Sequence, residues 1–177
     1  MSVTDKEFFD CEISWGITPE NPDYYNLMDA TANIIIDYSK NIIEIGAGMG
    51  TLGECLQKKG INYYGIEPNK YHRDFAYSRG LILCDLEDYP TNCQMIVSIE
   101  VMEHLTDKQI QDYLNKISCE YFLFSSTPYY TTPEQDASWG HINIKSEEKW
   151  IEFFSQFGFT LEKKLTLPTE WSLLFKK

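Results

Sequence analysis

The sequence predicts an α/β fold, a doubly wound sheet that is mainly parallel and ends in an antiparallel C-terminal hairpin strand. Short apolar segments rich in β-branched residues alternate with helical segments, which is typical of a parallel sheet with helices on both faces. The last segment, 159–177, instead contains two strand-like stretches around Pro168, which favours a closing hairpin. With 177 residues and 43% apolar residues, the chain is long enough for one domain with a full core.

The first half is predicted to contain four strands. Residues 24–38 carry apolar side chains at helical spacing, and the stretch NIIEIGAG (41–48) then changes to a buried strand stopped by glycines. The elements that follow are a helix at 51–60, a strand at 62–67, a helix at 69–80, and strands at 81–84 and 95–99. Both helices end in a glycine, the residue that most often closes a helix.

The second half continues the pattern and then departs from it. It is predicted to contain a helix at 106–117, a strand at 120–126, a helix from Ser146 to 158, and hairpin strands at 159–167 and 170–177. The loop at 126–145 is rich in Tyr, Thr and Pro and is longer than most connections, which indicates a functional segment.

Composition narrows the class of protein. A net charge of −12 and a pI near 4.6 oppose general nucleic-acid binding, which needs a basic surface, and favour cationic ligands. The five cysteines are scattered without a CxxC pair, which is typical of reduced thiols in the cytosol. The sequence shows neither a signal peptide nor an apolar run long enough for a membrane span. We therefore expect a soluble cytoplasmic domain.

A glycine-rich turn follows the first strand. Glu44, Gly46, Gly48 and Gly50 form an acid followed by G-x-G-x-G, and such glycines let a ligand approach the backbone at a helix N-terminus. A dinucleotide site would have G-x-G-x-x-G, but its third position is Thr51 here. The pattern resembles class I S-adenosylmethionine-dependent methyltransferases, which have a Rossmann-like sheet.

The order of the later residues supports this resemblance. Glu67 ends the second strand, where the family's acid holds the ribose hydroxyls, and Asp85 and Leu86 follow the third strand at the adenine-binding position. The resemblance implies S-adenosyl-L-methionine as the cofactor. The implied contacts are Glu44, Gly46, Gly48, Gly50, Glu67, Asp85, Leu86 and Ile99. The alternative is that the acids are ordinary loop-facing residues at strand ends.

The stretch SIEVMEHL follows the fourth strand. It places Glu100, Glu103 and His104 at i, i+3 and i+4, so we expect them on one face of a helix, where the two like charges repel. Ubiquinone-type O-methyltransferases carry a similar Glu-x-x-Glu-His. So do the metal-dependent enzymes that 2′-O-methylate the 3′ ends of small RNAs, in which these residues and a later histidine hold a divalent ion.

The later histidine also has a counterpart. Thr127 and Pro128 follow the fifth strand, as in those RNA enzymes, and His141 lies just before the next helix. The resemblance implies metal ligands at Glu100, Glu103, His104 and His141. Mixed nitrogen and oxygen ligands suit Mg²⁺, Mn²⁺ or Zn²⁺. Without a metal, His104 is the candidate catalytic base, or it only packs or caps.

The acceptor is less defined than the methyl donor. We expect a small hydroxylated molecule, such as a sugar, a catechol or phenol, or a nucleotide-linked metabolite, and no membrane partner. An RNA terminus is the alternative, with nucleic acid disfavoured by the charge, and a non-catalytic S-adenosylmethionine-binding module is a third hypothesis. The nearest basic residues are Lys145, Lys149, Lys163 and Lys164.

Other side chains receive simpler expectations. Trp15, Tyr129, Tyr130 and Trp139 are candidates for acceptor contacts or for loop packing, and His72 is read as a surface residue. We expect one domain over 1–177. Its parts are an N-terminal lid or helix at 1–40, a cofactor-binding half at 41–125, a substrate loop at 126–145, and the C-terminal helix and hairpin at 146–177.

Overall fold

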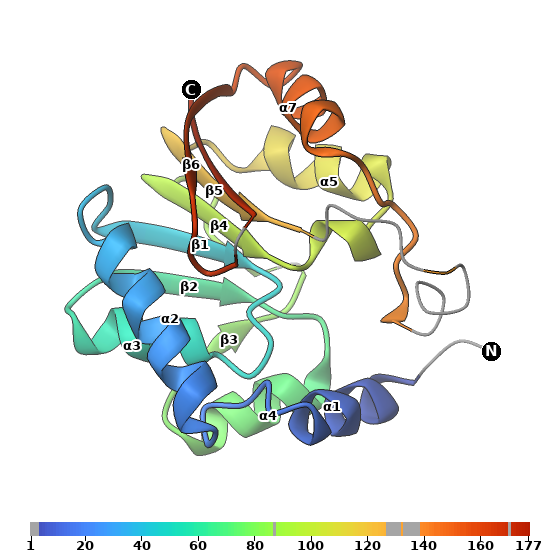
Figure 1. Cartoon of the computed structure of the whole chain (residues 1–177). Coiled ribbons are helices and arrows are strands. Elements are labelled where there is room, and N and C mark those ends of the chain that lie inside the picture. The colour runs from blue at the N-terminus through green and yellow to red at the C-terminus, as the bar shows by residue number, and fades with distance from the viewer. Residues whose placement is uncertain (1–3, 87, 127–131, 133–138, 170) are drawn as a thin grey trace. The chain divides into compact units, whose positions relative to one another are not determined.

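Three strands pair in parallel in the N-terminal part of the chain. The structure, a computed structural model, describes residues 4–86, 88–126, 132, 139–169 and 171–177. They fall into two compact units, residues 1–90 and 91–177. The elements of the first unit are α1 (Asp5–Ser14), α2 (Pro22–Ile35), β1 (Asn41–Ile45), α3 (Thr51–Lys58), β2 (Asn62–Ile66), α4 (Lys70–Ser78) and β3 (Leu83–Cys84). β2 pairs in parallel with both β1 and β3 (Figure 1).

The core of the first unit lies between its strands and helices. β1 is fully apolar apart from Asn41 and Glu44, and its isoleucines are buried together with Leu52 and Leu56 of α3. A strand whose alternate side chains are all buried is covered on both faces, which explains its continuous apolar sequence. The predicted strand, its glycine turn and the following helix are therefore confirmed.

Helix α1 lies in the N-terminal part, 1–40, for which a lid or helix was expected. Thr4 caps it through a reciprocal capping box, in which the Thr4 hydroxyl accepts from the Glu7 amide and the Glu7 carboxylate accepts from the Thr4 amide. The helix lies alongside α4, as Figure 1 shows in blue and green. Phe9 faces α4, with its ring centroid 5.9 Å from that of Phe75.

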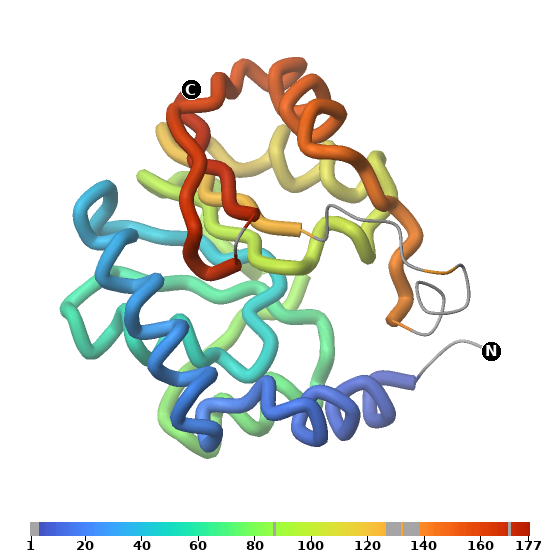
Figure 2. Tube along the Cα trace, viewed as in Figure 1, coloured from blue at the N-terminus to red at the C-terminus, as the bar shows by residue number. Residues whose placement is uncertain are grey.

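The second unit combines parallel and antiparallel pairing. Its elements are β4 (Met95–Ile99), the 3₁₀-helix η1 (Met102–His104), α5 (Asp107–Lys116), β5 (Tyr121–Ser125), α7 (Glu147–Ser155), β6 (Thr160–Leu165) and β7 (Ser172–Lys176). β4 pairs in parallel with β5, and β7 inserts antiparallel between β5 and β6. Figure 2 shows β6 and β7 as a red hairpin. The predicted mainly parallel α/β fold with its antiparallel C-terminal strand is confirmed.

An aromatic cluster fills the core of the second unit. Phe122 and Phe124 of β5 contact Phe154 of α7 edge to face, at centroid distances of 5.0 and 4.8 Å. Trp150 stacks on Phe154 at 5.4 Å, and all four rings are fully buried. This cluster fixes α7 on the sheet and thereby fixes the start of the helix next to His141. Among the described residues, no helix is both long enough and apolar enough to cross a membrane.

Candidate functional site

The glycine turn after β1 has the backbone geometry that only glycine adopts easily. Gly46, Gly48 and Gly50 have φ angles of 75°, 52° and 78°, in the left-handed region. A Cβ on Gly50 would lie 2.3 Å from Leu81 Cδ2, so this glycine is required for packing. A Cβ on Gly48 would meet no atom within 4 Å, so the backbone there borders open space. Gly48, unlike Gly50, therefore leaves room for a ligand.

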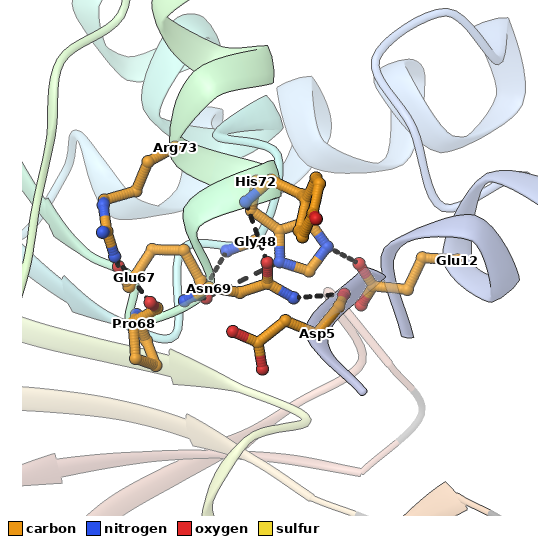
Figure 3. A network of polar contacts seen from close by, with 9 residues as sticks. Asp5, Glu12, Gly48, Glu67, Pro68, Asn69, His72 and Arg73 are labelled. Atoms are coloured by element: carbon orange, nitrogen blue, oxygen red, sulfur yellow. Dashed lines mark hydrogen bonds and ion pairs between the residues drawn. The ribbon is translucent and has the colours of Figure 1, made fainter. Parts of the chain in front are cut away.

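Glu67 lies at the end of β2 and faces this turn. Its Oε2 accepts a hydrogen bond from the Gly48 amide at 2.8 Å, and its Oε1 accepts from the Asn69 amide at 2.8 Å (Figure 3). A carboxylate can accept about four hydrogen bonds, so the two amides orient the group and leave capacity for further donors. The predicted ribose-binding acid is therefore held in contact with the glycine turn.

Glu44 points into the interior of the first unit. It is buried, and its Oε2 accepts a 2.5 Å hydrogen bond from the Tyr63 hydroxyl. Burial raises the pKa of Glu44 to about 8, although the hydrogen bond from Tyr63 opposes this shift and the charge of Glu67 adds to it. The buried Glu44 carboxyl is thus held in place by the Tyr63 hydroxyl, a partner that the sequence did not predict.

The remaining predicted cofactor contacts lie at strand ends. Asp85 follows β3, is exposed, and forms an ion pair with Arg73 at 2.9 Å. Its Oδ1 accepts from the amide of Leu86, whose side chain is also exposed. Ile99 is the last residue of β4 and is half-buried. Asp85 and Leu86 are available to a ligand, as a base-binding position requires.

Three of the four predicted metal ligands come together in the second unit. Glu103, His104 and His141 each offer a ligand atom, and these atoms all lie within 4.8 Å of one another. The rings of His104 and His141 are edge to face with centroids 4.9 Å apart. Glu103 is fully buried, and its Oε2 accepts from the Ser126 hydroxyl at 3.0 Å.

Backbone hydrogen bonds fasten the segment of His141 to η1. The carbonyl oxygen of Glu103 accepts from the amides of Ile142 and Asn143, at 2.8 and 3.0 Å. His104 Nδ1 lies 3.3 Å from the carbonyl oxygen of Gly140. We call these contacts the Glu103 clasp, because they hold two distant parts of the chain together at the three ligands.

The helix face expected for Glu100, Glu103 and His104 is wrong. Only Met102–His104 is helical, as a 3₁₀ turn, and Glu100 has a φ of 54°, a left-handed conformation that is rare outside glycine. The Glu100 amide extends the sheet by donating to Ser125 O, and its Oε1 accepts a 2.5 Å hydrogen bond from the Ser125 hydroxyl. The turn thus directs Glu100 toward β5.

The surroundings of His104 favour its neutral form. Burial and the neighbouring His141 together lower the pKa of His104 to about 4, although the contact with the Gly140 carbonyl opposes this shift. A neutral imidazole is the form that binds a metal ion. One buried carboxylate and two imidazoles fit a divalent cation by ligand type and by spacing.

The other residues that the sequence singled out have different outcomes. Tyr129, Tyr130, Thr127 and Pro128 lie outside the described residues. Trp139 is exposed and places its ring 5.5 Å from that of His141, whereas Trp15 is exposed at the end of α1.

The expectation of a surface position for His72 is wrong, because α1 covers it and leaves only 1% of the residue exposed. The Thr4-x-x-Glu7 capping box could have predicted the start of this helix, although not that it covers His72.

Comparison with known proteins identifies the family of the chain. Residues 23–164 match the family described as a methyltransferase domain. No match was found among curated proteins. Magnesium protoporphyrin IX methyltransferase from Synechocystis PCC 6803, solved with bound SAH, has a TM-score of 0.66 at 12% identity, covering 86% of this chain and 81% of that one.

Two further solved structures have similar folds. Geranyl diphosphate C-methyltransferase from Streptomyces coelicolor A3(2), in complex with Mg²⁺, geranyl diphosphate and S-adenosyl-L-homocysteine, has a TM-score of 0.66 at 10% identity, covering 83% of this chain and 78% of that one. The methyltransferase domain of bacterial CtHen1-C has a TM-score of 0.62 at 16% identity, covering 86% and 98%. Because the family match covers residues 23–164, most of this chain, the chain belongs to the class I S-adenosylmethionine-dependent methyltransferase domains.

Proposed function

We propose that this methyltransferase transfers the methyl group of S-adenosylmethionine to a hydroxyl of a small acceptor, assisted by a divalent metal ion. The acceptor class is a sugar, a catechol or phenol, or a nucleotide-linked metabolite. The observation that carries the proposal is the group of Glu103, His104 and His141, whose ligand atoms lie within 4.8 Å of one another. A metal-assisted methyl transfer requires such a cluster of ligand atoms, whereas a metal-free methyl transfer does not.

The chain's residues have distinct roles in this proposal. Glu103, His104 and His141 would hold Mg²⁺, Mn²⁺ or Zn²⁺, with Glu100 as the fourth proposed ligand. When bound, a divalent ion supplies Lewis acidity that lowers the pKa of a hydroxyl on the acceptor. Ser126 orients the Glu103 carboxylate through its hydrogen bond. If no ion binds, His104 is left as the candidate base.

The cofactor is proposed to lie against the glycine turn. Glu67 would accept hydrogen bonds from the ribose hydroxyls, because it is already oriented by the Gly48 and Asn69 amides. Asp85 and Leu86 would contact the adenine, and Ile99 would add an apolar contact. Glu44 stays in the proposed set with Gly46 and Gly50, as the base of the turn.

The second candidate acceptor is an RNA terminus. It is supported by the likeness to the bacterial CtHen1-C domain, together with the order of the four proposed ligands. Charge argues against it. Lys145 is paired with Asp107 at 2.6 Å and Lys164 with Glu147 at 2.5 Å, so these two lysines offer little net positive charge to a phosphate backbone. The small acceptor is therefore favoured.

Calorimetric titration of Mn²⁺ tests the metal proposal. Protein saturated with S-adenosylhomocysteine is titrated as wild type and as Glu103→Gln and His141→Ala. We expect one site that both substitutions abolish. The matched control is Glu152→Gln, which removes the same charge from an exposed position in α7 and leaves binding unchanged. Binding that ignores both site substitutions would refute the metal centre.

Turnover distinguishes the acceptor hypotheses. With S-adenosylmethionine and Mn²⁺, we expect methylation of vicinal diols or catechols, in which two adjacent oxygens can bind one ion. Methylation of an RNA 3′ end and not of small diols would establish the second candidate. Saturable cofactor binding without transfer to any member of the panel would support the non-catalytic module.

A further inference from the structure

His72 connects the N-terminal helix with the proposed cofactor-binding carboxylate. It lies in α4 and is buried, with Nε2 2.7 Å from Glu12 Oε2 in α1 and Nδ1 3.6 Å from Glu67 Oε1 (Figure 3). Each ring nitrogen therefore faces a carboxylate. A neutral imidazole has only one N–H, whereas the imidazolium presents an N–H to both carboxylates. The contact with Glu67 is longer than a hydrogen bond, so it is an ion pair at most, and a charged histidine between two acids is the form that satisfies both sides.

The surroundings explain why the charge persists in a buried position. Burial lowers the pKa of His72, but the neighbouring carboxylates of Glu12 and Glu67 outweigh burial and raise it to about 9. From α1, Phe8 and Phe9 also face the imidazole, with centroids 6.1 and 5.3 Å away. These rings exclude water from the ion pairs, which strengthens them.

The other charged groups nearby are engaged differently. The Arg73 guanidinium donates to the backbone carbonyl oxygens of Glu67 and Pro68, and it also pairs with Asp85. It therefore holds the loop after β2 by its backbone. Tyr24 of α2 lies near Glu12, and burial raises the pKa of this tyrosine far above the range in which His72 titrates.

A second contact joins α1 to the same loop. Asn69 caps α4, with its Oδ1 accepting from the Tyr71 amide, and its Nδ2 donates to the carbonyl oxygen of Asp5 at 2.9 Å. The Asn69 amide in turn donates to Glu67. Because α1 has no buried residue of its own, these polar contacts and the phenylalanine rings are what attach it to α4.

We propose that His72 is a positioning residue for the methyl donor, whose imidazolium bridges Glu12 and Glu67 so that docking of α1 and orientation of the ribose-binding carboxylate are coupled. This inference rests on the proposed role of Glu67. Loss of the proton leaves one ring nitrogen without an N–H opposite a carboxylate, which weakens the link between α1 and Glu67. The N-terminal helix thereby becomes part of cofactor binding without contacting the reacting atoms.

Affinity for S-adenosylhomocysteine, measured by calorimetry from pH 6 to 10, tests the bridge. Wild type is expected to bind steadily to about pH 8 and to weaken as pH rises through about 9, the pKa of His72. His72→Gln is expected to bind about tenfold to a hundredfold more weakly at pH 7, as for the loss of a charge-assisted contact. The amino group of the ligand titrates equally with both proteins, so the ratio of the two affinities isolates His72.

Glu12→Gln and Asp10→Asn form a matched pair that does not depend on the folding of His72→Gln. Both remove one charge from α1, but Asp10 forms an exposed pair with Lys6. Glu12→Gln is expected to move the fall in affinity toward neutral pH, because His72 loses a partner that raises its pKa, whereas Asp10→Asn leaves the profile unchanged. A purely structural role for Glu12 would lower stability without moving the profile.

Hydrogen exchange supplies an independent measure of coupling. S-adenosylhomocysteine is expected to slow exchange of the α1 amides in wild type and to have little effect on them in His72→Gln. Equal affinity and equal protection in the two proteins would overturn the bridge and leave the proposed function standing. If wild type failed to bind the ligand at every pH, the cofactor assignment itself would fail, and this inference with it.

Discussion

Alanine substitutions at three glycines can separate an effect on cofactor binding from an effect on folding stability. Gly48, Gly50 and Gly60 all have positive φ, at 52°, 78° and 76°. Alanine at any of them is expected to cost about 1–2 kcal/mol, the penalty for a side chain in the left-handed region. Gly60→Ala measures this penalty alone, because a Cβ there meets no atom within 4 Å. It is the reference variant.

Compared with this reference, Gly50→Ala should lose more stability, whereas Gly48→Ala should lose cofactor binding. At Gly50 the Cβ would lie 2.3 Å from Leu81 Cδ2, so overpacking adds about 1–3 kcal/mol and the total reaches about 2–5 kcal/mol. At Gly48 the Cβ meets nothing within 4 Å, so Gly48→Ala should be no less stable than Gly60→Ala. That Cβ, however, occupies the space proposed for the cofactor, and binding should be lost.

Urea denaturation and calorimetric titration with S-adenosylhomocysteine, carried out on all three variants, measure the two effects separately. The expected pattern is reduced stability with intact binding for Gly60→Ala and reduced stability with lost binding for Gly48→Ala. Cofactor affinity in Gly48→Ala equal to that in Gly60→Ala would refute the placement of the cofactor at the turn. Equal stability of Gly50→Ala and Gly60→Ala would refute the steric argument.

Three further predictions concern single side chains. The pKa of Glu44 is about 8 in the folded state, above its ordinary value of 4.5, so between these two pH values the folded state binds a proton that the unfolded state has lost. The free energy of unfolding should therefore fall as pH rises from about 4.5 to 8. Glu44→Gln should flatten that fall, as measured by urea denaturation at several pH values. Ser126→Ala removes the hydroxyl that orients Glu103 and should weaken Mn²⁺ binding about tenfold to a hundredfold by calorimetry, whereas unchanged affinity would rule out this role. Phe154→Ala deletes the centre of the aromatic cluster and should cost about 3–5 kcal/mol in urea denaturation, and a cost below about 1 kcal/mol would show that the cluster collapses around the gap.

Local sequence patterns were sufficient for the strands and for the glycine turn. The apolar run of β1 and its stop at Gly46 depend on neighbouring residues alone, so periodicity and glycine content predicted them. The closing hairpin was predictable for the same reason. The association of His141 with Glu103 was implied by family resemblance, because no local pattern joins residues so far apart in the chain.

Two expectations failed because tertiary contacts override local spacing. Glu100 donates its amide to β5, and this added sheet hydrogen bond forces a left-handed turn where the spacing predicted a helix. His72 lies within a helix in a polar stretch, which predicted exposure, but α1, about 60 residues earlier in the sequence, covers it. The same covering places Glu12 against His72, which also faces the proposed cofactor carboxylate, and the spacing of these residues in the sequence does not predict this.

The Glu103 clasp has a consequence for the thermodynamics of ion capture. The amides of Ile142 and Asn143 donate to the Glu103 carbonyl oxygen of η1, so the two segments that carry the proposed ligands are already joined in the folded chain. The entropy of closing a loop is then spent during folding and not at the moment of binding. Ion uptake at the proposed centre should therefore proceed with little chain ordering, and its heat-capacity change should be small.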